Sequence, residues 1–367
     1  MFESISPELI RLGLSPFFMQ QLHALEGEGQ VGRVACERRG QYEVLTSTGV
    51  RRASLSGRLE HRLGDDDRPT VGDWVVVEPS EPVGRVVEVL ERQSVLRRAV
   101  VDGTSRAQNL AANVDVCCVV AALSDGDAHT RRRALNTRRI ERYLATAQGS
   151  NIPGLVLINK ADVVSAEEAE EALQSLAPLH ARVLLVSART GQGLSELHAE
   201  LPTGTSAVLL GSSGVGKSTL VNALLGEERQ RTSAERADDS RGRHTTTERQ
   251  LLELSSGALL IDTPGMRELA LWADSDTELG GFDDIERLAA DCQFRDCRHE
   301  SEPGCAVLAA IETGTLAAER LQHARKLEKE RLFQQARVDV RLRSEQAARQ
   351  KTLSRAVRVQ LKNKGRR

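Results

Sequence analysis

The sequence predicts a multidomain protein with an N-terminal β-barrel of the OB type, a central α/β domain and a C-terminal α-helical zinc-binding module. Three observations predict this architecture: short β-rich runs upstream of residue 105, a strand and a helix joined by a glycine loop at residue 211, and clustered cysteines after residue 290. With 367 residues and 40% hydrophobic content, the chain is long enough for two or three domains.

The first predicted domain is the barrel. Residues 1–29 are expected to form a loosely attached extension with one short helix, and residues 30–105 hold about five β-rich runs, which suggests a small closed barrel. Its basic residues include Arg33, Arg38, Arg39, Arg51, Arg52 and Arg62. Aromatic residues are only 3% of the chain, so phosphate and shape contacts fit this module better than base stacking. The alternative is a barrel that only packs against the next domain.

A phosphate loop is the strongest motif of the central domain. Gly211, Ser212, Ser213, Gly214, Val215, Gly216, Lys217 and Ser218 fit the pattern G-x-x-x-x-G-K-[ST] in full, between an apolar run and a segment with helical spacing. Glycines let backbone N–H groups point at phosphate oxygens, and the helix N-terminus adds its positive dipole end. We expect Lys217 to reach the β- and γ-phosphates and Ser218 to ligate Mg²⁺. The alternative is a Gly/Ser turn between a strand and a helix.

A second motif predicts recognition of guanine. Asn159, Lys160 and Asp162 follow an apolar run that reads as a buried strand, so their side chains face the ligand crevice of an α/β sheet. The Asp162 carboxylate can accept hydrogen bonds from the N1–H and the N2 amine of guanine, and adenine offers no such pair. Ser187 and Ala188 close another strand, where the Ala188 N–H could meet the guanine O6. Alone, these short motifs could be surface turns.

The last nucleotide motif is Asp262-Thr263-Pro264-Gly265. It closes an apolar strand, so Asp262 is expected to hold Mg²⁺ through water and the Gly265 N–H to sense the γ-phosphate. The next residue is Met266, where Ras-like enzymes carry a glutamine that positions the attacking water. A thioether cannot do that work.

Between the phosphate loop and Asp262 lies a polar, aperiodic segment, 226–247, which suits a mobile switch loop. It ends in a run of three threonines, of which Thr246 is expected to bind Mg²⁺ and the γ-phosphate. His244, just before them, is a candidate to orient the water that Met266 cannot. The alternative is a solvated loop histidine.

The order of the motifs is rotated. In ordinary GTPases the phosphate loop comes first and the Asn-Lys-x-Asp motif follows, whereas here Asn159 precedes Gly211. This order predicts a circularly permuted GTPase domain, which we place at residues 106–278.

The downstream cysteines predict a metal site in a module at residues 279–340. Cys292, Cys297, His299 and Cys305 have the spacing C-x4-C-x-H-x5-C, and four N/S ligands suit a closed, structural Zn²⁺ site. The alternative is an incidental cluster. The remaining cysteines, Cys36, Cys117 and Cys118, lie in predicted strands and are interpreted as small core residues.

Charge is distributed unevenly. From Ala324 to Arg367 there are fifteen Lys/Arg and four Asp/Glu, although the whole chain has a net charge of −2. Such a segment, with the tail 341–367, is typical of nucleic-acid binding, the alternative being a solvated basic helix. No apolar stretch reaches the ~18 residues of a membrane helix, and no signal peptide is evident, so we expect a cytoplasmic protein that is a monomer without membrane contact.

Together these features resemble the ribosome small subunit-dependent GTPase A family over roughly residues 30–340. The resemblance implies a GTPase that binds GTP, GDP and Mg²⁺, carries one structural Zn²⁺ and acts late in assembly of the small ribosomal subunit, with rRNA as a partner and hydrolysis stimulated by the subunit. It assigns guanine to Asn159 and Asp162, phosphate to the segment from Gly211 to Thr219, and zinc to the cysteine and histidine cluster. The segment 125–136, with its Arg131-Arg132-Arg133 run, is longer and more basic than the family pattern.

Three alternatives remain at this point. A P-loop kinase would not explain the Asn-Lys-x-Asp motif. An RNA-binding assembly placeholder, using GTP only as a structural ligand, is consistent with Met266 in place of the usual glutamine. A permuted GTPase of large-subunit assembly would share the motif order but not the OB and zinc flanks.

Overall fold

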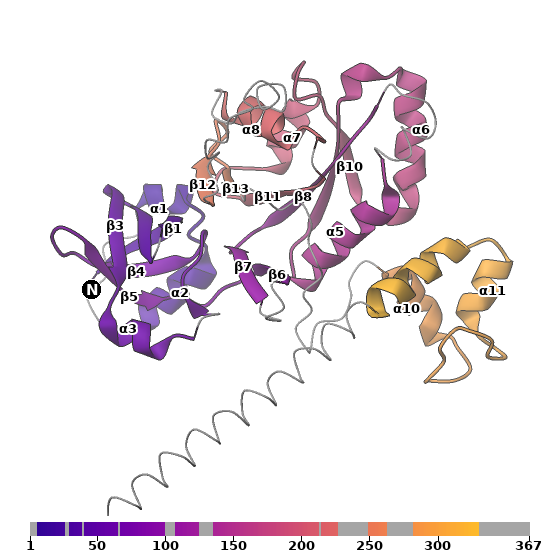
Figure 1. The fold of residues 1–367 in the computed structure, drawn as a ribbon, viewed down its shortest axis with the longest axis horizontal. Coiled ribbons are helices and arrows are strands. Elements are labelled where there is room, and N and C mark those ends of the chain that lie inside the picture. Colours follow the sequence, from indigo (N-terminus) through magenta and orange to yellow (C-terminus); the bar gives the residue numbers. More distant parts are fainter. Residues whose placement is uncertain are drawn as a thin grey trace, which may run out of the picture. The chain divides into compact units, whose positions relative to one another are not determined.

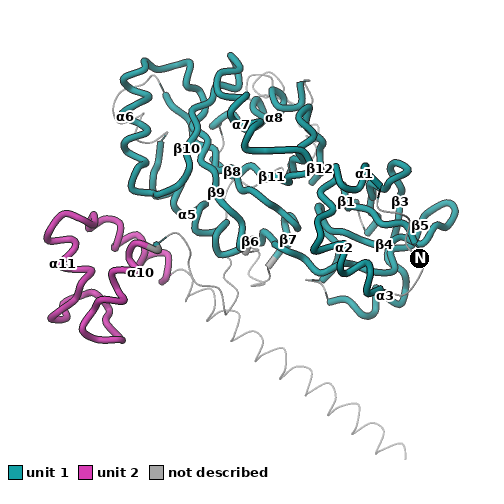
Figure 2. The backbone as a smooth tube through the Cα atoms, turned by 180° about the vertical axis from the view of Figure 1, so that it is seen from behind, with its two compact units in different colours: residues 1–98, 108–269, 280–283 teal, residues 99–107, 270–279, 284–367 magenta. Residues whose placement is uncertain are grey.

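The computed structural model in Figure 1 describes residues 6–25, 29–38, 40–64, 67–99, 107–124, 135–212, 214–226, 249–262 and 282–329. The chain forms two compact units (Figure 2). One comprises residues 1–98, 108–269 and 280–283, and the other residues 99–107, 270–279 and 284–367. The larger unit contains the barrel and the nucleotide-binding domain.

Two short helices open the chain, α1 (Pro7–Arg11) and α2 (Pro16–Ala24). Each begins with a serine followed by proline, a sequence that starts helices because proline needs no N–H partner in the first turn. Leu9 and Phe18 are each 2% exposed and join the core of the larger unit. The expectation of a loose extension with one helix is therefore wrong. These helices are too short to show a clear period, and tertiary packing holds them.

The barrel has the OB-type closure that the sequence predicts. Its strand order is β1-β2-β3-β5-β4, and β1 also pairs with β4, which closes the sheet on itself. The helix α3 (Gly57–Arg62) follows β3. The barrel strands are β1 (Gln30–Arg38), β2 (Gln41–Thr46), β3 (Gly49–Leu55), β4 (Trp74–Glu78) and β5 (Gly84–Val89).

The nucleotide-binding domain is built on a parallel sheet with the order β10-β9-β8-β11-β13, to which β12 adds an antiparallel edge. A two-stranded sheet, β6 and β7, comes between the barrel and this domain in the chain. The strands are β6 (Val95–Ala99), β7 (Ala107–Ala112), β8 (Val116–Ala122), β9 (Gly154–Asn159), β10 (Arg182–Leu185), β11 (Ser206–Leu210), β12 (Gln250–Glu253) and β13 (Leu259–Asp262).

Helices cover both faces of this sheet. Ile140 of α5 and Ala169 of α6 pack with one set of strand residues, and Leu197 of α7 and Leu220 of α8 pack with the alternate set. Because both faces are covered, the strands are almost continuously apolar. The helices are α5 (Thr137–Gly149), α6 (Ala166–Leu176), α7 (Leu194–Glu200) and α8 (Lys217–Leu225), with 3₁₀ turns η2 (Ala161–Val163) and η3 (Ala177–Leu179).

Arg33 connects the three parts of the larger unit. Its guanidinium donates to the carbonyl oxygens of Leu12 (2.6 Å), Gly72 (3.1 Å) and Asn113 (2.9 Å), and it lies 5.7 Å from the ring centre of Trp74. Burial lowers its pKa to about 10, so it stays charged at neutral pH. Counting Arg33 with the basic surface of the barrel is wrong, because it is 1% exposed.

A backbone pairing also joins the barrel to the nucleotide-binding domain. Cys36 of β1 pairs with Gln250 of β12, so the barrel and the nucleotide-binding sheet form one 11-stranded sheet in the described part of the chain. The edge strand of the nucleotide-binding sheet, β12, is thereby paired with a strand of the same chain.

The smaller unit is helical. Its described residues include most of α10 (Asp283–Ala290), α11 (Ala306–Glu312) and a helical stretch from 318 to 329. Arg320, 8% exposed, donates to both carboxylate oxygens of Asp284 at 2.5 and 2.8 Å. Across the residues described, no helix has the length and apolar character needed to span a membrane.

Candidate nucleotide and metal sites

The predicted nucleotide-binding residues gather at one edge of the parallel sheet. Asn159 is the last residue of β9, Gly211 follows β11, and Asp262 ends β13. In open α/β sheets, ligands bind outside the carboxyl ends of the strands. Three motifs that are far apart in the sequence therefore meet because parallel strands end together.

Asn159 joins these motifs. Its Nδ2 donates to the carbonyl oxygen of Val215 in the phosphate loop (2.9 Å), and its Oδ1 accepts from the Ala188 N–H (3.1 Å). The side chain is buried, with the residue 2% exposed. The Ala188 N–H, which the sequence assigned to the guanine O6, is thus engaged with Asn159 in this structure.

Asp162 is held by two neighbours. Its Oδ1 accepts from the Ser187 hydroxyl at 2.5 Å, and its Oδ2 pairs with the Arg189 guanidinium. The Ser187 hydrogen bond, and to a smaller extent Arg189, hold the pKa of Asp162 below its ordinary value although burial raises it. An ionised carboxylate is what the two donors of guanine require. Lys160 precedes η2 with a left-handed backbone, φ 63°.

Two glycines of the phosphate loop are required by its neighbours. A Cβ on Gly211 would lie 2.3 Å from the Val120 carbonyl oxygen, and one on Gly216 would lie 2.4 Å from Asn159 Nδ2. Gly216 also has φ +92°, in the left-handed region that favours glycine. The loop therefore packs against both β8 and the base-reading motif.

Lys217 opens α8 and turns back over the loop. Its Nζ donates to the carbonyl oxygens of Gly211 (2.7 Å) and Ser212 (2.8 Å). Ser218 and Thr219 occupy the first turn of the same helix, and Gly214 is exposed. The arrangement holds a cation at the start of the loop, beside a helix N-terminus that favours anions.

Other predicted residues lie outside the described part of the chain. They are Arg39, Ser213, His244, Thr246, Thr263, Pro264, Gly265, Met266, Arg131, Arg132, Arg133 and the tail 341–367.

Sequence reasoning left one charged residue without a role. Arg139, in the first turn of α5, donates from Nη1 to the hydroxyl of Ser212 at 2.5 Å. Its own N–H is held by the N-cap residue Asn136, through Oδ1 at 3.1 Å. The available signal in the sequence was the Asn-x-x-Arg pattern of a helix N-terminus at Asn136. Only the fold shows that the Arg139 side chain reaches the phosphate loop.

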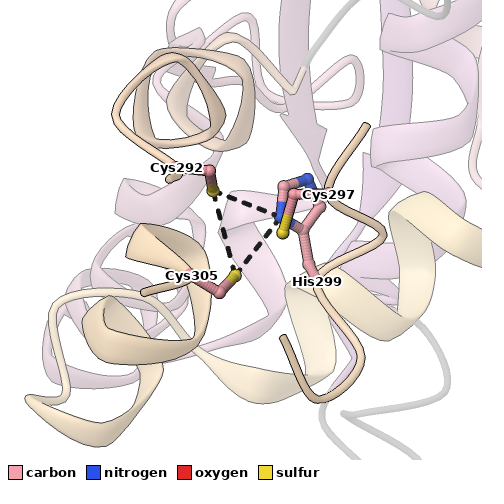
Figure 3. A group of neighbouring side chains, drawn as sticks. All are labelled: Cys292, Cys297, His299 and Cys305. Atoms are coloured by element: carbon pink, nitrogen blue, oxygen red, sulfur yellow. Dashed lines mark hydrogen bonds between the residues drawn. The ribbon is translucent and has the colours of Figure 1, made fainter. Parts of the chain in front are cut away.

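The four predicted metal ligands lie together in the smaller unit (Figure 3). Their ligand atoms are all within 4.8 Å of one another. Cys292 Sγ is 3.6 Å from His299 Nδ1 and 3.9 Å from Cys305 Sγ, and His299 Nδ1 is 3.4 Å from Cys305 Sγ. Tetrahedral Zn²⁺ with Zn–S near 2.3 Å and Zn–N near 2.0 Å separates its ligand atoms by about 3.5–3.8 Å. The donor set and spacing fit zinc.

Surrounding groups shape the loop that carries these ligands. Arg325 donates to the carbonyl oxygen of His299 at 2.5 Å, and the Glu302 carboxylate accepts three backbone N–H bonds, which lower its pKa to about 2. Burial and the Arg325 charge lower the pKa of His299, which favours the neutral imidazole that binds metals. Gly304, at φ +70°, makes the turn before Cys305.

Comparison with known proteins identifies the family. A family model described as RsgA GTPase matches residues 89–272. The chain belongs to the RsgA GTPase family. It is similar to "Small ribosomal subunit biogenesis GTPase RsgA" of Streptomyces avermitilis, with 42% identity over 94% of this chain and 91% of that protein. It is also similar to "Small ribosomal subunit biogenesis GTPase RsgA 2" of Lactiplantibacillus plantarum, with 39% identity over 89% and 90%.

Solved structures agree with the RsgA fold. YjeQ from Thermotoga maritima aligns with a TM-score of 0.61 and 26% identity, covering 83% of this chain and 98% of that one. YloQ, described as a circularly permuted GTPase, aligns with a TM-score of 0.57 and 24% identity, covering 85% and 96%. The predicted permutation is confirmed, and the chain is a GTPase. Family membership implies GTP, GDP and Mg²⁺, and the cluster is compatible with zinc.

Proposed function

We propose that this chain hydrolyses GTP during biogenesis of the small ribosomal subunit, acting in the cytoplasm as a monomer that binds the subunit and its rRNA. The observation that carries the proposal is that Asn159 joins the base-reading and phosphate-binding motifs. Relatives that match over nearly the full length of this chain are named small ribosomal subunit biogenesis GTPase RsgA. A P-loop kinase would not explain the Asn-Lys-x-Asp motif at the guanine end of this site.

In the proposed nucleotide site, Asp162 accepts from the guanine edge, and Lys217 with the backbone N–H groups of Gly211 to Thr219 surrounds the phosphates. Mg²⁺ would be held by Ser218 and Thr246, with Asp262 acting through water, and would neutralise charge on the β- and γ-phosphates. The geometry supports this assignment because Lys217 already lies over the loop. The sequence supports His244 as the group that orients the attacking water.

In the proposed metal site, Cys292, Cys297, His299 and Cys305 hold one structural Zn²⁺. All four positions come from protein, so no open position remains for catalysis. Ligand-atom separations near those of tetrahedral zinc support the assignment.

We also propose that the domains along the chain have separate roles. A helical N-terminal segment (1–29), whose described helices pack in the core of the larger unit, and a barrel (30–105) precede the GTPase domain (106–278). The zinc module (279–340) and a basic tail (341–367) follow it. The barrel, zinc module and tail would contact rRNA, and the nucleotide state would set how tightly they bind. Pairing of Cys36 with Gln250 supports this coupling, because the strand that follows the predicted switch loop is bonded to the barrel.

The test is binding of purified small ribosomal subunits in the presence of a non-hydrolysable GTP analogue or GDP. We expect tighter binding with the analogue. Removing residues after 340 should weaken it and flatten its salt dependence, each lost phosphate contact lowering the log–log slope by about 0.7–0.9. Equal binding in both nucleotide states would contradict the proposal.

A further inference from the structure

Arg139 holds a position that neither the motifs nor the proposed function explains. It follows β8, which lies beside the phosphate-loop strand β11, so the first turn of α5 comes to the carboxyl edge of the sheet. Asn136 caps the helix, and the next residue, Ile140, is 3% exposed in the core. The backbone of Arg139 is thus fixed while its side chain is exposed.

The guanidinium reaches the phosphate loop. Arg139 Nη1 lies 2.5 Å from the hydroxyl of Ser212, the residue whose carbonyl oxygen accepts from Lys217 Nζ at 2.8 Å. Two cations from different helices therefore converge on one loop residue. Five N–H donors are available on a guanidinium, and this contact uses one.

The charge of Arg139 has no acidic partner in the described part of the chain. Its partner is a neutral hydroxyl, and among the described residues no carboxylate pairs with it. Other exposed arginines of this unit, such as Arg62 with Glu88 and Arg182 with Glu200, have acidic partners. A permanent cation at a phosphate loop, with no carboxylate partner among the described residues, is suited to an anionic ligand.

We propose that Arg139 is a cis-acting arginine of the GTPase site, contacting the γ-phosphate as GTP is hydrolysed; this rests on the proposed nucleotide site. Water oxygen bonds to the γ-phosphorus, the bond from phosphorus to the β–γ bridging oxygen breaks, and the bond's electron pair leaves on GDP. The proton that the water loses passes to a phosphate oxygen or to solvent. Negative charge builds on the bridging and γ oxygens, and the guanidinium N–H groups stabilise it without transferring a proton. Arginines supplied in cis serve other GTPases in this way.

The experiment compares Arg139→Ala with the control Arg138→Ala, an exposed neighbour in the same helical turn. Binding of GDP with aluminium fluoride, which mimics the transferring phosphoryl group, should weaken about 30-fold or more in Arg139→Ala, while binding of GDP alone changes little. Single-turnover hydrolysis should fall by about 10²- to 10³-fold. Arg138→Ala should match wild type in all three measurements, and circular dichroism checks folding.

A role through Ser212 alone would give a different result. If Arg139 only positions the loop, the effect of Arg139→Ala disappears in a Ser212→Ala background; if it contacts phosphate, the same factor is lost in both backgrounds. The proposal is overturned if the effect of Arg139→Ala disappears in the Ser212→Ala background, or if Arg139→Ala binds GDP with aluminium fluoride as tightly as wild type. If wild type binds GDP weakly or without preference for guanine, the proposed nucleotide site fails instead. The fluoride measurement needs no turnover, so it decides the role of Arg139 even for a slow enzyme.

Discussion

The nucleotide site and the cysteine cluster are built in opposite ways. In the larger unit, site residues extend from the ends of buried strands, and Asn159, Asp162 and Ser187 already hydrogen-bond to one another or to the loops around them. In the smaller unit, the ligands lie in an irregular stretch, 291–305, in which Phe294 is 43% exposed. The first site is organised by the strands that carry it, whereas the ligands of the second come from a stretch without regular secondary structure.

This difference teaches which ligand is part of the folded structure. The larger unit buries residues from helices on both faces of its sheet, so nucleotide should leave without unfolding it. Among the described residues of the smaller unit, the buried apolar side chains include Ile285, Val307 and Leu321. A bound structural metal contributes folding free energy directly, so we expect zinc to stabilise the smaller unit more than nucleotide stabilises the larger one.

The largest effect is expected at the preorganised site. Lys217→Ala should lower GTP affinity and turnover by about 10²-fold or more, because it removes the cation that the loop supplies to the phosphates. The fold should be unchanged by circular dichroism. Arg62→Ala, which removes a surface cation paired with Glu88, should leave nucleotide affinity as in wild type. Full activity of Lys217→Ala would place the phosphates elsewhere.

Removal of metal should act on the other unit. Purified protein should carry about one zinc per chain, and Cys297→Ser should release it and speed hydrogen exchange across 284–329 while protection of the nucleotide-binding sheet is retained. The control is Cys36→Ala, which removes a buried thiol outside the cluster. This variant should retain the zinc of the cluster. Absence of zinc from intact protein, or loss of protection in both units, would break the comparison.

Base choice tests the guanine end of the nucleotide site. Asp162→Asn should weaken GTP binding by about 10- to 100-fold and favour xanthosine triphosphate, whose extra carbonyl can accept from the new amide. Arg189→Ala is the matched control, since it touches the same carboxylate but should leave the preference for guanine unchanged. A competition assay showing unchanged preference in Asp162→Asn would remove this carboxylate from the base site.

A smaller effect is expected from the ion pair that supports the metal unit. Asp284→Asn should destabilise that unit by about 2–3 kcal/mol, because it removes the carboxylate charge that the buried Arg320 guanidinium pairs with. Asp291→Asn, an exposed neighbour, should be near neutral. Hydrogen exchange of residues 284–329 at pH 7 measures both.

The same pair predicts a pH dependence. Burial raises the pKa of Asp284, but the Arg320 hydrogen bonds and charge outweigh it, so the pKa is below its ordinary value of 3.8. A lowered folded-state pKa gives stability that is complete above the unfolded pKa and is lost as pH falls through the folded one. The difference between wild type and Asp284→Asn should thus be equal at pH 7 and 5 and shrink below about 4. Thermal unfolding over that range checks it, and a difference that grows on acidification would contradict it.

Local patterns predicted much of this structure. The strand before Gly211, the helix after it, the base-reading strand and the barrel closure follow from runs whose period or composition is distinctive, and the four metal ligands follow from residue types that zinc prefers. What local sequence could not supply was tertiary environment. Arg33 reads as a surface arginine until its three carbonyl partners are seen, and the contact of Arg139 with Ser212 depends on which strands are neighbours.

The central claim is that a permuted GTPase site in the larger unit serves the small ribosomal subunit. It is tested most directly by GTP turnover of the full chain alone, with small subunits and with large subunits. We predict stimulation by small subunits only, and that His244→Ala binds GTP and small subunits but responds poorly, as expected of a residue needed only to position water. Turnover that small subunits leave unchanged, or that large subunits raise equally, would contradict the account.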